Sequence, residues 1–391
     1  MKSFQNRLFQ IVGLILLTII FIPGSDVFAE NDDGSEPYTG DVLCLPDVYL
    51  QSSTDCLPLG PSEIITSMAS QGIVYPLRPV TGATPNADNN LLNIEYAKIN
   101  VFPPDRAPLY TSLDDASQGG SPYRYLDPGE IIYVSYDYRS DVNGNAYIYT
   151  KSGAWMRASP TTFTTFQGLE FQDNPITSVG WIVSETKPRV SPGFNAVELN
   201  ETFYRETVVP VYDIQEIDGY KWYMIGINQW VDRRNIRVLN VNTDTPQGIP
   251  TDRWIEINLY EQTLAIYENN ELVFGTLAAT GVDPYFTQPG VFQIYEKKDT
   301  ETMSGAFAAD RSDYYYLEDV PWTMYYDQKR AIHGAYWRTL FGFEQSHGCV
   351  NLSVGDARYA FDWAQVGDWV YVWDPSGETP TDPAFYTAGG A

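Results

Sequence analysis

Short hydrophobic segments separated by turn-forming residues make up most of this chain of 391 residues. In the segment 254–260, Ile255, Ile257 and Leu259 occupy alternate positions, which places them on one face of a strand. Asn143-Gly144 lies between two such segments and predicts a tight hairpin turn. The same pattern predicts further strands at residues 94–100, 130–136, 146–150, 208–212, 221–226, 264–268, 271–280, 291–297 and 368–373. We therefore expect a mainly β fold.

One segment near the C-terminus has a helical pattern instead. Ser353 followed three residues later by Asp356 is typical of a capping box at the start of a helix. Tyr359 and Trp363 then lie at the spacing of one helical face, and Gly367 marks the end of the pattern. The C-terminal part of the chain is thus predicted to be mostly β with one short helix.

The rest of the chain divides into segments of different character. Residues 91–160 and 176–242 each contain a Pro-x-Tyr sequence and, further on, a Trp-Met or Trp-Val pair. This repetition favours two small SH3-like β-barrel modules, although all-β sequences also repeat such short patterns by chance. Residues 243–251 have the composition of a linker, which leaves 251–373 as a C-terminal domain. Residues 374–391 are rich in Pro, Thr and Gly and are expected to form a flexible tail.

The N-terminus has the features of an export signal. Lys2 and Arg7 precede an apolar run at residues 8–22, and residues 27–29 resemble a small-residue cleavage site. The run is shorter than the roughly 20 residues that a membrane-spanning helix needs. We expect residues 1–29 to be a cleaved signal peptide, with an uncleaved membrane anchor as the alternative. In both cases the rest of the chain lies outside the cytoplasm, secreted or anchored in the cell envelope.

Export makes the three cysteines informative. Residues 30–90 form an acidic, turn-rich leader that contains Cys44 and Cys56. In an oxidising compartment these two are expected to form a disulfide, and the alternative is a reduced, buried pair. Cys349 is then left over, and an unpaired cysteine in an exported protein is a candidate reactive thiol.

The charge of the chain limits its partners. Fifty acidic residues against 24 basic ones give a net charge of −26. Nucleic-acid binding needs a basic surface, so we expect no nucleic-acid partner. The same charge disfavours docking on anionic lipid, so a membrane contact is expected only through the possible N-terminal anchor.

Both histidines of the chain, His333 and His347, fall together with Cys349 within a stretch of seventeen residues. Attack of a cysteine on a carbonyl needs a thiolate, an imidazole that takes the thiol proton, and donors for the oxyanion. Cys349 supplies the thiol, and Gly348 before it allows the backbone to turn so that successive N–H groups converge. The cluster therefore has the residue types of a cysteine-dependent acyl-transfer site.

Two other functions fit parts of this pattern. His333, His347 and Cys349 have the donor atoms of a zinc site with one open position. However, neither His-Glu-x-x-His nor a Cys-x-x-Cys pair is present, and His347 and Cys349 are too close in sequence to coordinate one ion comfortably. We therefore expect no metal and no other cofactor. The remaining alternative is a non-catalytic cell-wall-binding protein whose β-rich N-terminal half binds glycan or peptide.

The C-terminal region resembles a known family. His333-Gly334 followed by Ser346-His347-Gly348-Cys349-Val350-Asn351 is similar to the signature of the L,D-transpeptidases, the YkuD-type catalytic domain of bacterial cell walls. Thr280-Gly281 and Thr287-Gln288-Pro289-Gly290 resemble two upstream elements of that family. The resemblance covers about residues 251–373. Many members carry Arg where Asn351 stands in this chain.

The resemblance implies a role for each residue of the motif. Cys349 would be the nucleophile, His333 the general base and later the general acid, and the carbonyl of Gly334 would orient the imidazole. The backbone N–H groups of Gly348 and Cys349 would form the oxyanion hole. Supporting residues would be Ser346 and His347, and candidates for the substrate groove are Tyr336, Trp337 and Asn351. Tyr314-Tyr315-Tyr316 would belong either to a lid over the site or to an exposed β edge.

The resemblance also implies the reaction and the fold. The thiolate would attack the L,D peptide bond of a peptidoglycan stem tetrapeptide and release D-alanine, leaving a thioester. An amine of a second stem peptide would then resolve the thioester and form a cross-link. Water in place of the amine would make the same residues an L,D-carboxypeptidase. The family fold is a mostly β sandwich, in agreement with the strands predicted above.

Overall fold

A computed structural model describes Ser70 and residues 82–101, 104–129, 131–175, 177–306, 311 and 313–386. Contacts divide the chain into two compact units, residues 1–72 and 73–391, and all described residues except Ser70 belong to the second. The predicted signal peptide and the expected pair Cys44 and Cys56 lie outside the described residues. Within the described ranges, no helix has the length and apolarity that a membrane span requires.

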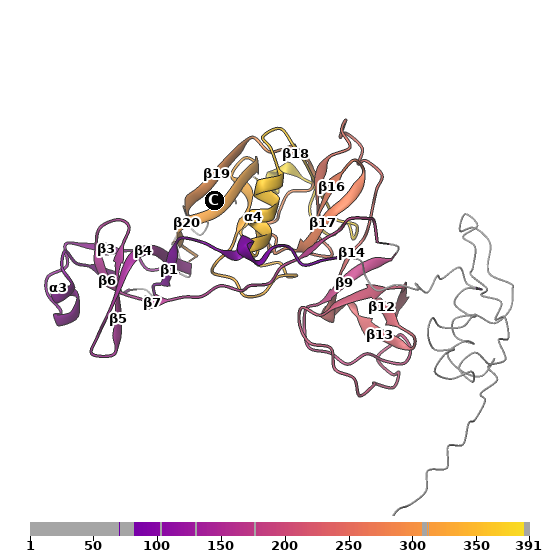
Figure 1. The fold of residues 1–391 in the computed structure, drawn as a ribbon, viewed down its shortest axis with the longest axis horizontal. Helices are drawn as coiled ribbons and strands as arrows, with labels where there is room; N and C mark the ends of the chain where they lie inside the picture. Colours follow the sequence, from indigo (N-terminus) through magenta and orange to yellow (C-terminus); the bar gives the residue numbers. More distant parts are fainter. Residues whose placement is uncertain are drawn as a thin grey trace, which may run out of the picture. The chain divides into compact units, whose positions relative to one another are not determined.

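The fold is mainly β, as predicted (Figure 1). In the first predicted module the strands are β1 (Glu95–Lys98), β2 (Ala107–Leu109), β3 (Arg124–Leu126), β4 (Ile131–Val142), β5 (Asn145–Thr150), β6 (Trp155–Arg157) and β7 (Ser159–Pro160), with the short helix α3 (Leu113–Gln118). The second contains β9 (Ser178–Ile182), β10 (Val208–Val211), β11 (Asp213–Ile217), β12 (Tyr220–Gly226), β13 (Gln229–Asp232) and β14 (Ile236–Leu239). Their assignment to the SH3-like type stays a prediction.

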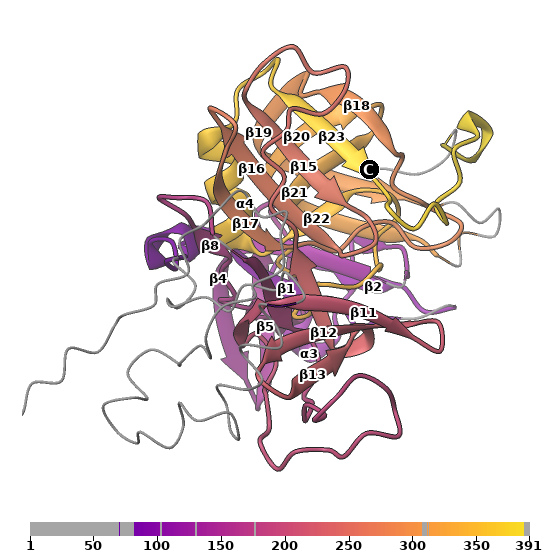
Figure 2. The same ribbon diagram turned by 90° about the vertical axis from the view of Figure 1, so that its right-hand side faces the viewer.

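The C-terminal domain is built from two sheets and one helix. Its strands are β15 (Trp254–Asn258), β16 (Thr263–Glu268), β17 (Glu271–Leu277), β18 (Gly290–Gln293), β19 (Glu296–Gly305), β20 (Tyr315–Asp327), β21 (Arg330–Gly334), β22 (Val350–Leu352) and β23 (Trp369–Trp373), and its helix is α4 (Val354–Trp363). One sheet has the order β18-β23-β15-β16-β17-β8, where β8 (Leu169–Glu170) comes from the preceding segment. The other contains β22, β21, β20 and β19 (Figure 2).

A hydrophobic core lies between these two sheets. Ile255 and Ile257 of β15 belong to the same buried cluster as Ile332 of β21 and Val350 of β22. The alternation seen in the sequence therefore marks the core face correctly. The other face of β15 is not exposed, because Trp254 packs in a second buried cluster with residues of the segments 166–183 and 239–249. The domain consequently buries both sides of its central strand.

The turn predicted at Asn143-Gly144 forms as expected, and a second hairpin has a turn of the same kind. Asn143 and Gly144 have φ values of 51° and 77° and join β4 to β5. Asn269 and Asn270 have φ values of 55° and 61° and join β16 to β17. Positive φ at both central residues gives the turn a twist that matches the right-handed twist of the strands. These turns fix the register of both hairpins.

The prediction of one continuous strand at residues 291–297 is wrong. It is divided into β18, which pairs with β23, and β19, which pairs with β20 in the other sheet. Ile294 and Tyr295 form the crossing between the two sheets. The hydrophobic pattern cannot show this change, because residues on both sides of the crossing contribute to buried surfaces.

Helix α4 confirms the predicted helix, with one difference at its start. Ser353 is the N-cap, and its hydroxyl accepts a hydrogen bond from the Asp356 backbone N–H at 3.2 Å. The Asp356 carboxylate is engaged elsewhere, since it accepts from the Gly168 N–H at 2.9 Å and from the Thr276 hydroxyl. Only the Ser353 half of the expected capping box is therefore formed. The Asp356 carboxylate instead links the helix to the segments that carry Gly168 and Thr276.

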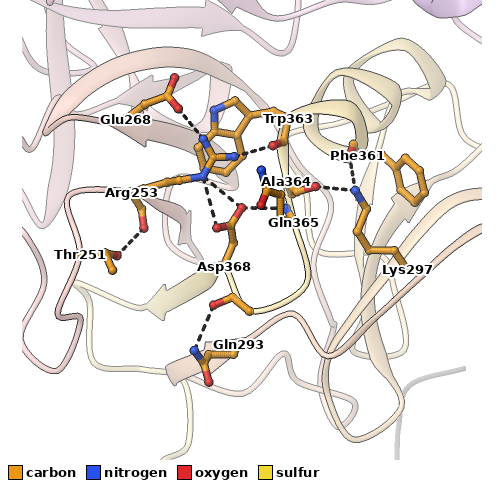
Figure 3. A network of polar contacts seen from close by, with 11 residues as sticks. Thr251, Arg253, Glu268, Gln293, Lys297, Phe361, Trp363, Ala364, Gln365 and Asp368 are labelled. Carbon is orange, nitrogen blue, oxygen red and sulfur yellow. Dashed lines mark hydrogen bonds and ion pairs between the residues drawn. The ribbon is translucent and has the colours of Figure 1, made fainter.

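Arg253 fixes the far end of the helix to the sheet (Figure 3). Its guanidinium lies 3.5 Å from the ring centroid of Trp363 and donates to the Trp363 carbonyl. It also bonds both carboxylate oxygens of Asp368 at 3.2 Å, and it pairs with Glu268. One side chain thereby joins the start of β15, the end of β16, the end of α4 and the residue before β23.

The tail, expected to be flexible, makes contacts as far as the structure describes it. A short 3₁₀ helix, η4, spans Pro383–Tyr386, and Tyr386 is buried. The Arg330 guanidinium donates to the Tyr386 carbonyl at 3.2 Å and pairs with Asp327 at 2.9 Å. The tail thus reaches back to the turn between β20 and β21.

Burial of Glu256 on β15 makes the stability of this domain depend on pH. Burial raises the pKa of its carboxyl from 4.5 to about 7, although Trp373 Nε1 donates to it at 3.0 Å. Because the folded state keeps the proton above pH 4.5 while the unfolded state loses it, folding free energy is lost as the pH rises from 4.5 to about 7. Glu256→Gln should therefore be more stable than the parent at pH 8, by about 3 kcal/mol.

Denaturant unfolding at pH 5 and pH 8 checks this expectation. The advantage of Glu256→Gln should shrink towards pH 5, and the exposed Glu271→Gln on β17 should show no such change. An equal stability difference at both pH values would contradict a protonated Glu256 in the folded domain.

Candidate active site

The site begins with the pairing of two short parallel strands. In the register of β21 and β22, His333 lies opposite Asn351. Cys349 directly precedes β22, so it enters the same edge of the sheet. His333, Cys349 and Asn351 also line one cavity. The structure therefore brings together the two predicted catalytic residues and one of the predicted groove residues.

His333 is buried and held from both ring nitrogens. Its Nδ1 lies 3.3 Å from the Gly334 carbonyl oxygen, and its Nε2 lies 3.2 Å from Nδ2 of Asn351. A carbonyl oxygen only accepts hydrogen bonds, so Nδ1 must carry the proton and Nε2 must carry the lone pair. The Gly334 carbonyl is therefore within reach of the ring, as its implied role of orienting the imidazole requires.

Arg338 fixes the orientation of the Asn351 amide. Its Nε donates to Oδ1 of Asn351 at 2.6 Å, which turns the amide NH₂ towards His333. Arg338 is itself held by Gln345, whose side-chain and main-chain oxygens it contacts at 3.2 Å and 2.5 Å. The chain Gln345–Arg338–Asn351 therefore selects one tautomer of His333, with Nε2 as the basic nitrogen.

The surroundings keep His333 neutral. The pKa of the imidazole is lowered from 6.5 to about 4, mainly by burial; the hydrogen bond to Gly334 acts in the opposite direction, and the positive charge of Arg338 adds to the lowering. At neutral pH the ring is therefore unprotonated. Such a ring can accept a proton from a neighbouring thiol, which a protonated ring cannot do.

Hydrogen bonds to the upstream segment shape the loop that carries Cys349. Ser346 N–H donates to the Thr280 carbonyl at 2.9 Å. The Thr287 hydroxyl donates to the Gly348 carbonyl at 2.9 Å and accepts from the Gly281 N–H at 2.9 Å. The two Thr-containing elements noted in the sequence thus act as supports for the cysteine loop.

The predicted oxyanion role of Gly348 is not what the structure shows. Its φ of 113° gives the sharp turn expected of a glycine at this position. Its N–H, however, donates to the Ser346 hydroxyl at 3.1 Å, and that hydroxyl donates to the Cys349 carbonyl at 2.5 Å. Ser346 therefore closes a tight loop around the cysteine, and the Gly348 N–H is used inside that loop.

Polar and apolar residues line the cavity together. Together with its open mouth it has a volume of about 390 Å³. Besides His333, Cys349 and Asn351, the polar residues that line it are Arg338, Ser346 and His347. The apolar and aromatic residues that line it are Ile131, Met303, Tyr315, Leu317 and Trp337. The His347 ring packs between Tyr285 and Tyr315, at centroid distances of 4.9 Å and 5.5 Å.

Tyr336, a predicted groove residue, does not line the cavity. Its side chain is buried beneath Tyr96, with ring centroids 3.5 Å apart, and its hydroxyl donates to the Glu318 carbonyl at 2.7 Å. Trp337, the next residue, does line the cavity. Consecutive side chains point in different directions here, so only one of the two adjacent rings reaches the site.

Sequence reasoning missed several residues of the site. Arg338 could be recognised from the sequence as a candidate site residue, because it is the one basic residue between the two histidines. Tyr315 belongs to the tyrosine run at residues 314–316 and lines the cavity. It lies on β20 between β19 and β4, so it does not belong to an exposed β edge. Ile131 had no signal, since it lies some 200 residues before the motif and reaches the cavity only through the pairing of β4 with β20.

The zinc alternative finds no support in the geometry. In the part of the chain that the structure describes, no three His, Cys, Asp or Glu side chains come together as they would around a metal ion. His333, the first of the suggested ligands, has both ring nitrogens within hydrogen-bonding distance of protein groups. Cys349 forms no disulfide and is buried.

Comparison with protein families supports the resemblance seen in the motif. Residues 252–372 match the family model of YkuD, the L,D-transpeptidase catalytic domain. The resemblance predicted from the sequence is thereby confirmed for this part of the chain. No curated protein sequence matches the chain.

The solved structures to which part of this chain is similar include several L,D-transpeptidases. A crystal structure from Stackebrandtia nassauensis is 26% identical over 33% of this chain and 57% of its own, with a TM-score of 0.26. The catalytic domain of the E. faecium enzyme is 26% identical over 32% of this chain and 100% of its own, with a TM-score of 0.29. A Xylanimonas cellulosilytica structure is 22% identical over 33% of this chain and 63% of its own, with a TM-score of 0.27.

The charge of Arg338 gives a direct test of the His333 environment. Arg338→Gln keeps a donor near Asn351 but removes the positive charge that lowers the His333 pKa. We expect the imidazole of the parent to titrate near pH 4 and that of the variant at a higher pH. NMR of protein labelled with ¹⁵N-histidine measures both midpoints. An unchanged midpoint would show that Arg338 does not act on the ring through its charge.

Proposed function

We propose that this protein is an exported, cysteine-dependent L,D-transpeptidase that cross-links peptidoglycan stem peptides. The observation that carries the proposal is the cavity that is lined by both Cys349 and a neutral His333 with an oriented, basic Nε2. The match of residues 252–372 to the L,D-transpeptidase catalytic domain supports the same conclusion. A donor stem peptide and an amine-bearing acceptor stem are the partners, and no cofactor takes part.

In the first half-reaction, Nε2 of His333 gives up its hydrogen bond from Asn351 and takes the thiol proton of Cys349. The thiolate attacks the carbonyl carbon of the L,D peptide bond, and the backbone N–H of Cys349 donates to the oxyanion that develops on the carbonyl oxygen of the substrate. The imidazolium then gives its proton to the nitrogen of the leaving D-alanine. The C–N bond breaks, and the acyl group remains on sulfur as a thioester.

In the second half-reaction, the amine of another stem peptide attacks the thioester carbonyl. His333 takes a proton from the attacking nitrogen and returns it to the departing sulfur, so the enzyme ends in its starting state. The Gly334 carbonyl stabilises the transient imidazolium through the Nδ1 proton. Water as the acceptor would give a shortened stem peptide, which is the L,D-carboxypeptidase alternative.

The location of this chemistry follows from its substrate. Stem peptides of peptidoglycan lie outside the cytoplasmic membrane, so an enzyme that acts on them must be exported. The apolar N-terminal run is consistent with export. A net charge of −26 would attract a cationic acceptor amine towards the protein, an effect that salt weakens.

Incubation of the mature chain with a stem tetrapeptide tests the proposal. Mass spectrometry should detect release of D-alanine, a thioester on the protein, and a cross-linked dimer when an acceptor amine is added. Cys349→Ala should lower the rate by at least about 1,000-fold, because no thioester can form. His333→Gln should lower it by roughly 100- to 10,000-fold.

Two outcomes would change the assignment. Release of D-alanine without any dimer, at every acceptor concentration, would replace transpeptidation by hydrolysis with the same residues. Activity that survives Cys349→Ala would overturn the cysteine mechanism altogether. Cys349→Ser is a matched control for packing, since it keeps a side chain of similar size at the same buried position.

A further inference from the structure

The first N-terminal module adds a strand to the sheet that carries the site. β4 pairs in parallel with β20, with Ile131 opposite Tyr315, Ile132 opposite Tyr316, and Tyr133 opposite Leu317. β20 also pairs with β19 and, further along, with β21, which carries His333. The module and the catalytic strands therefore form one continuous hydrogen-bonded sheet.

Gly129 permits this close pairing. A Cβ atom placed on Gly129 would lie 2.2 Å from the carbonyl oxygen of Tyr314, the residue just before β20. Real Cβ atoms do not approach backbone oxygen so closely, so any larger residue at this position would push the two chains apart. Its φ is not in the left-handed region, so an alanine would fit the backbone but not the junction.

Polar contacts lock the junction at a bulged part of β20. Ser135 of β4 donates from its N–H to the Glu318 carboxylate at 2.9 Å and from its hydroxyl to Asp319 at 2.6 Å. Lys151 pairs with the same Asp319 carboxylate at 3.1 Å, and the Tyr96 hydroxyl donates to the Asp319 carbonyl at 2.7 Å. Buried and half-buried bonds of this kind hold a register more firmly than an exposed ion pair does.

An apolar cluster completes the junction. It joins Tyr96 and Tyr133 of the module to Met303, Leu317 and Tyr336 of the catalytic domain, and Ile131 packs against it. Met303 and Leu317 also line the cavity, and so does Ile131. The same side chains thus belong to the contact between the two regions and to the lining of the cavity that His333 and Arg338 also line.

We infer that the module at residues 91–160 is a structural part of the active site, in which Ile131 forms part of the substrate-binding wall and determines which acyl donors fit. This inference rests on the proposed function for the identity of the donor. Ile131 contacts nonpolar groups of the bound donor peptide, and the pairing of β4 holds the β20 part of the wall in place. The catalytic region without this module lacks one side of its cavity.

Substitutions at two positions separate the contributions of wall and junction. Ile131→Trp fills the cavity and should lower kcat/KM for the tetrapeptide at least tenfold, mainly through KM, whereas Ile131→Val should change it less than threefold. Gly129→Ala should open the junction without altering a side chain of the cavity. Hydrogen exchange of the amides at residues 315–317 should then be at least tenfold faster than in the parent.

Tyr138→Ala is the matched control, because Tyr138 lies on the same strand β4 but is 64% exposed and pairs with β5. It should leave both the exchange and the kinetics unchanged. Equal kcat/KM in the parent and Ile131→Trp would overturn the role of Ile131 as a wall. Unchanged exchange in Gly129→Ala would overturn the junction. A parent protein that forms no thioester would overturn the proposed function instead, while the exchange result would still decide the junction.

Discussion

The parallel pairing of β21 with β22 is the constraint on which the site depends. It places His333 beside Asn351 and brings Cys349 to the same edge, although the motif spans a loop between them. β20 supports β21 from the other side, and α4 follows directly after β22. A shift of one residue in this pairing would move His333 to the opposite face of the sheet and separate the imidazole from the cavity.

The chemistry of the site follows from how this pairing buries the imidazole. A buried His333 stays neutral, and two fixed partners decide which of its nitrogens is basic. Arg338 contributes twice, since it orients the Asn351 amide and adds a positive charge beside the ring. The chain as a whole has a net charge of −26. Among the described residues that line the cavity, Arg338 is the one lysine or arginine, and it lies next to the proposed base.

Local patterns in the sequence predict much of this structure. The hairpin turns at Asn143 and Asn269 and helix α4 are governed by nearby residues, and the motif from His333 to Asn351 locates the centre of the site. The rest depends on tertiary contacts that no local pattern records. The crossing at Ile294 and Tyr295, the burial of Tyr336 and the arrival of Ile131 at the cavity all arise from strand pairings between distant segments. The use of the Gly348 N–H by Ser346 is likewise a matter of loop geometry.

The central claim is that Cys349 is a nucleophile activated by its surroundings. Incubation of the mature protein with a carbapenem, followed by intact mass measurement and peptide mapping, tests it most directly. The account predicts a single acyl adduct on Cys349, with none on the Cys349→Ala protein. An unmodified parent protein, or an adduct on a residue outside the cavity, would contradict it.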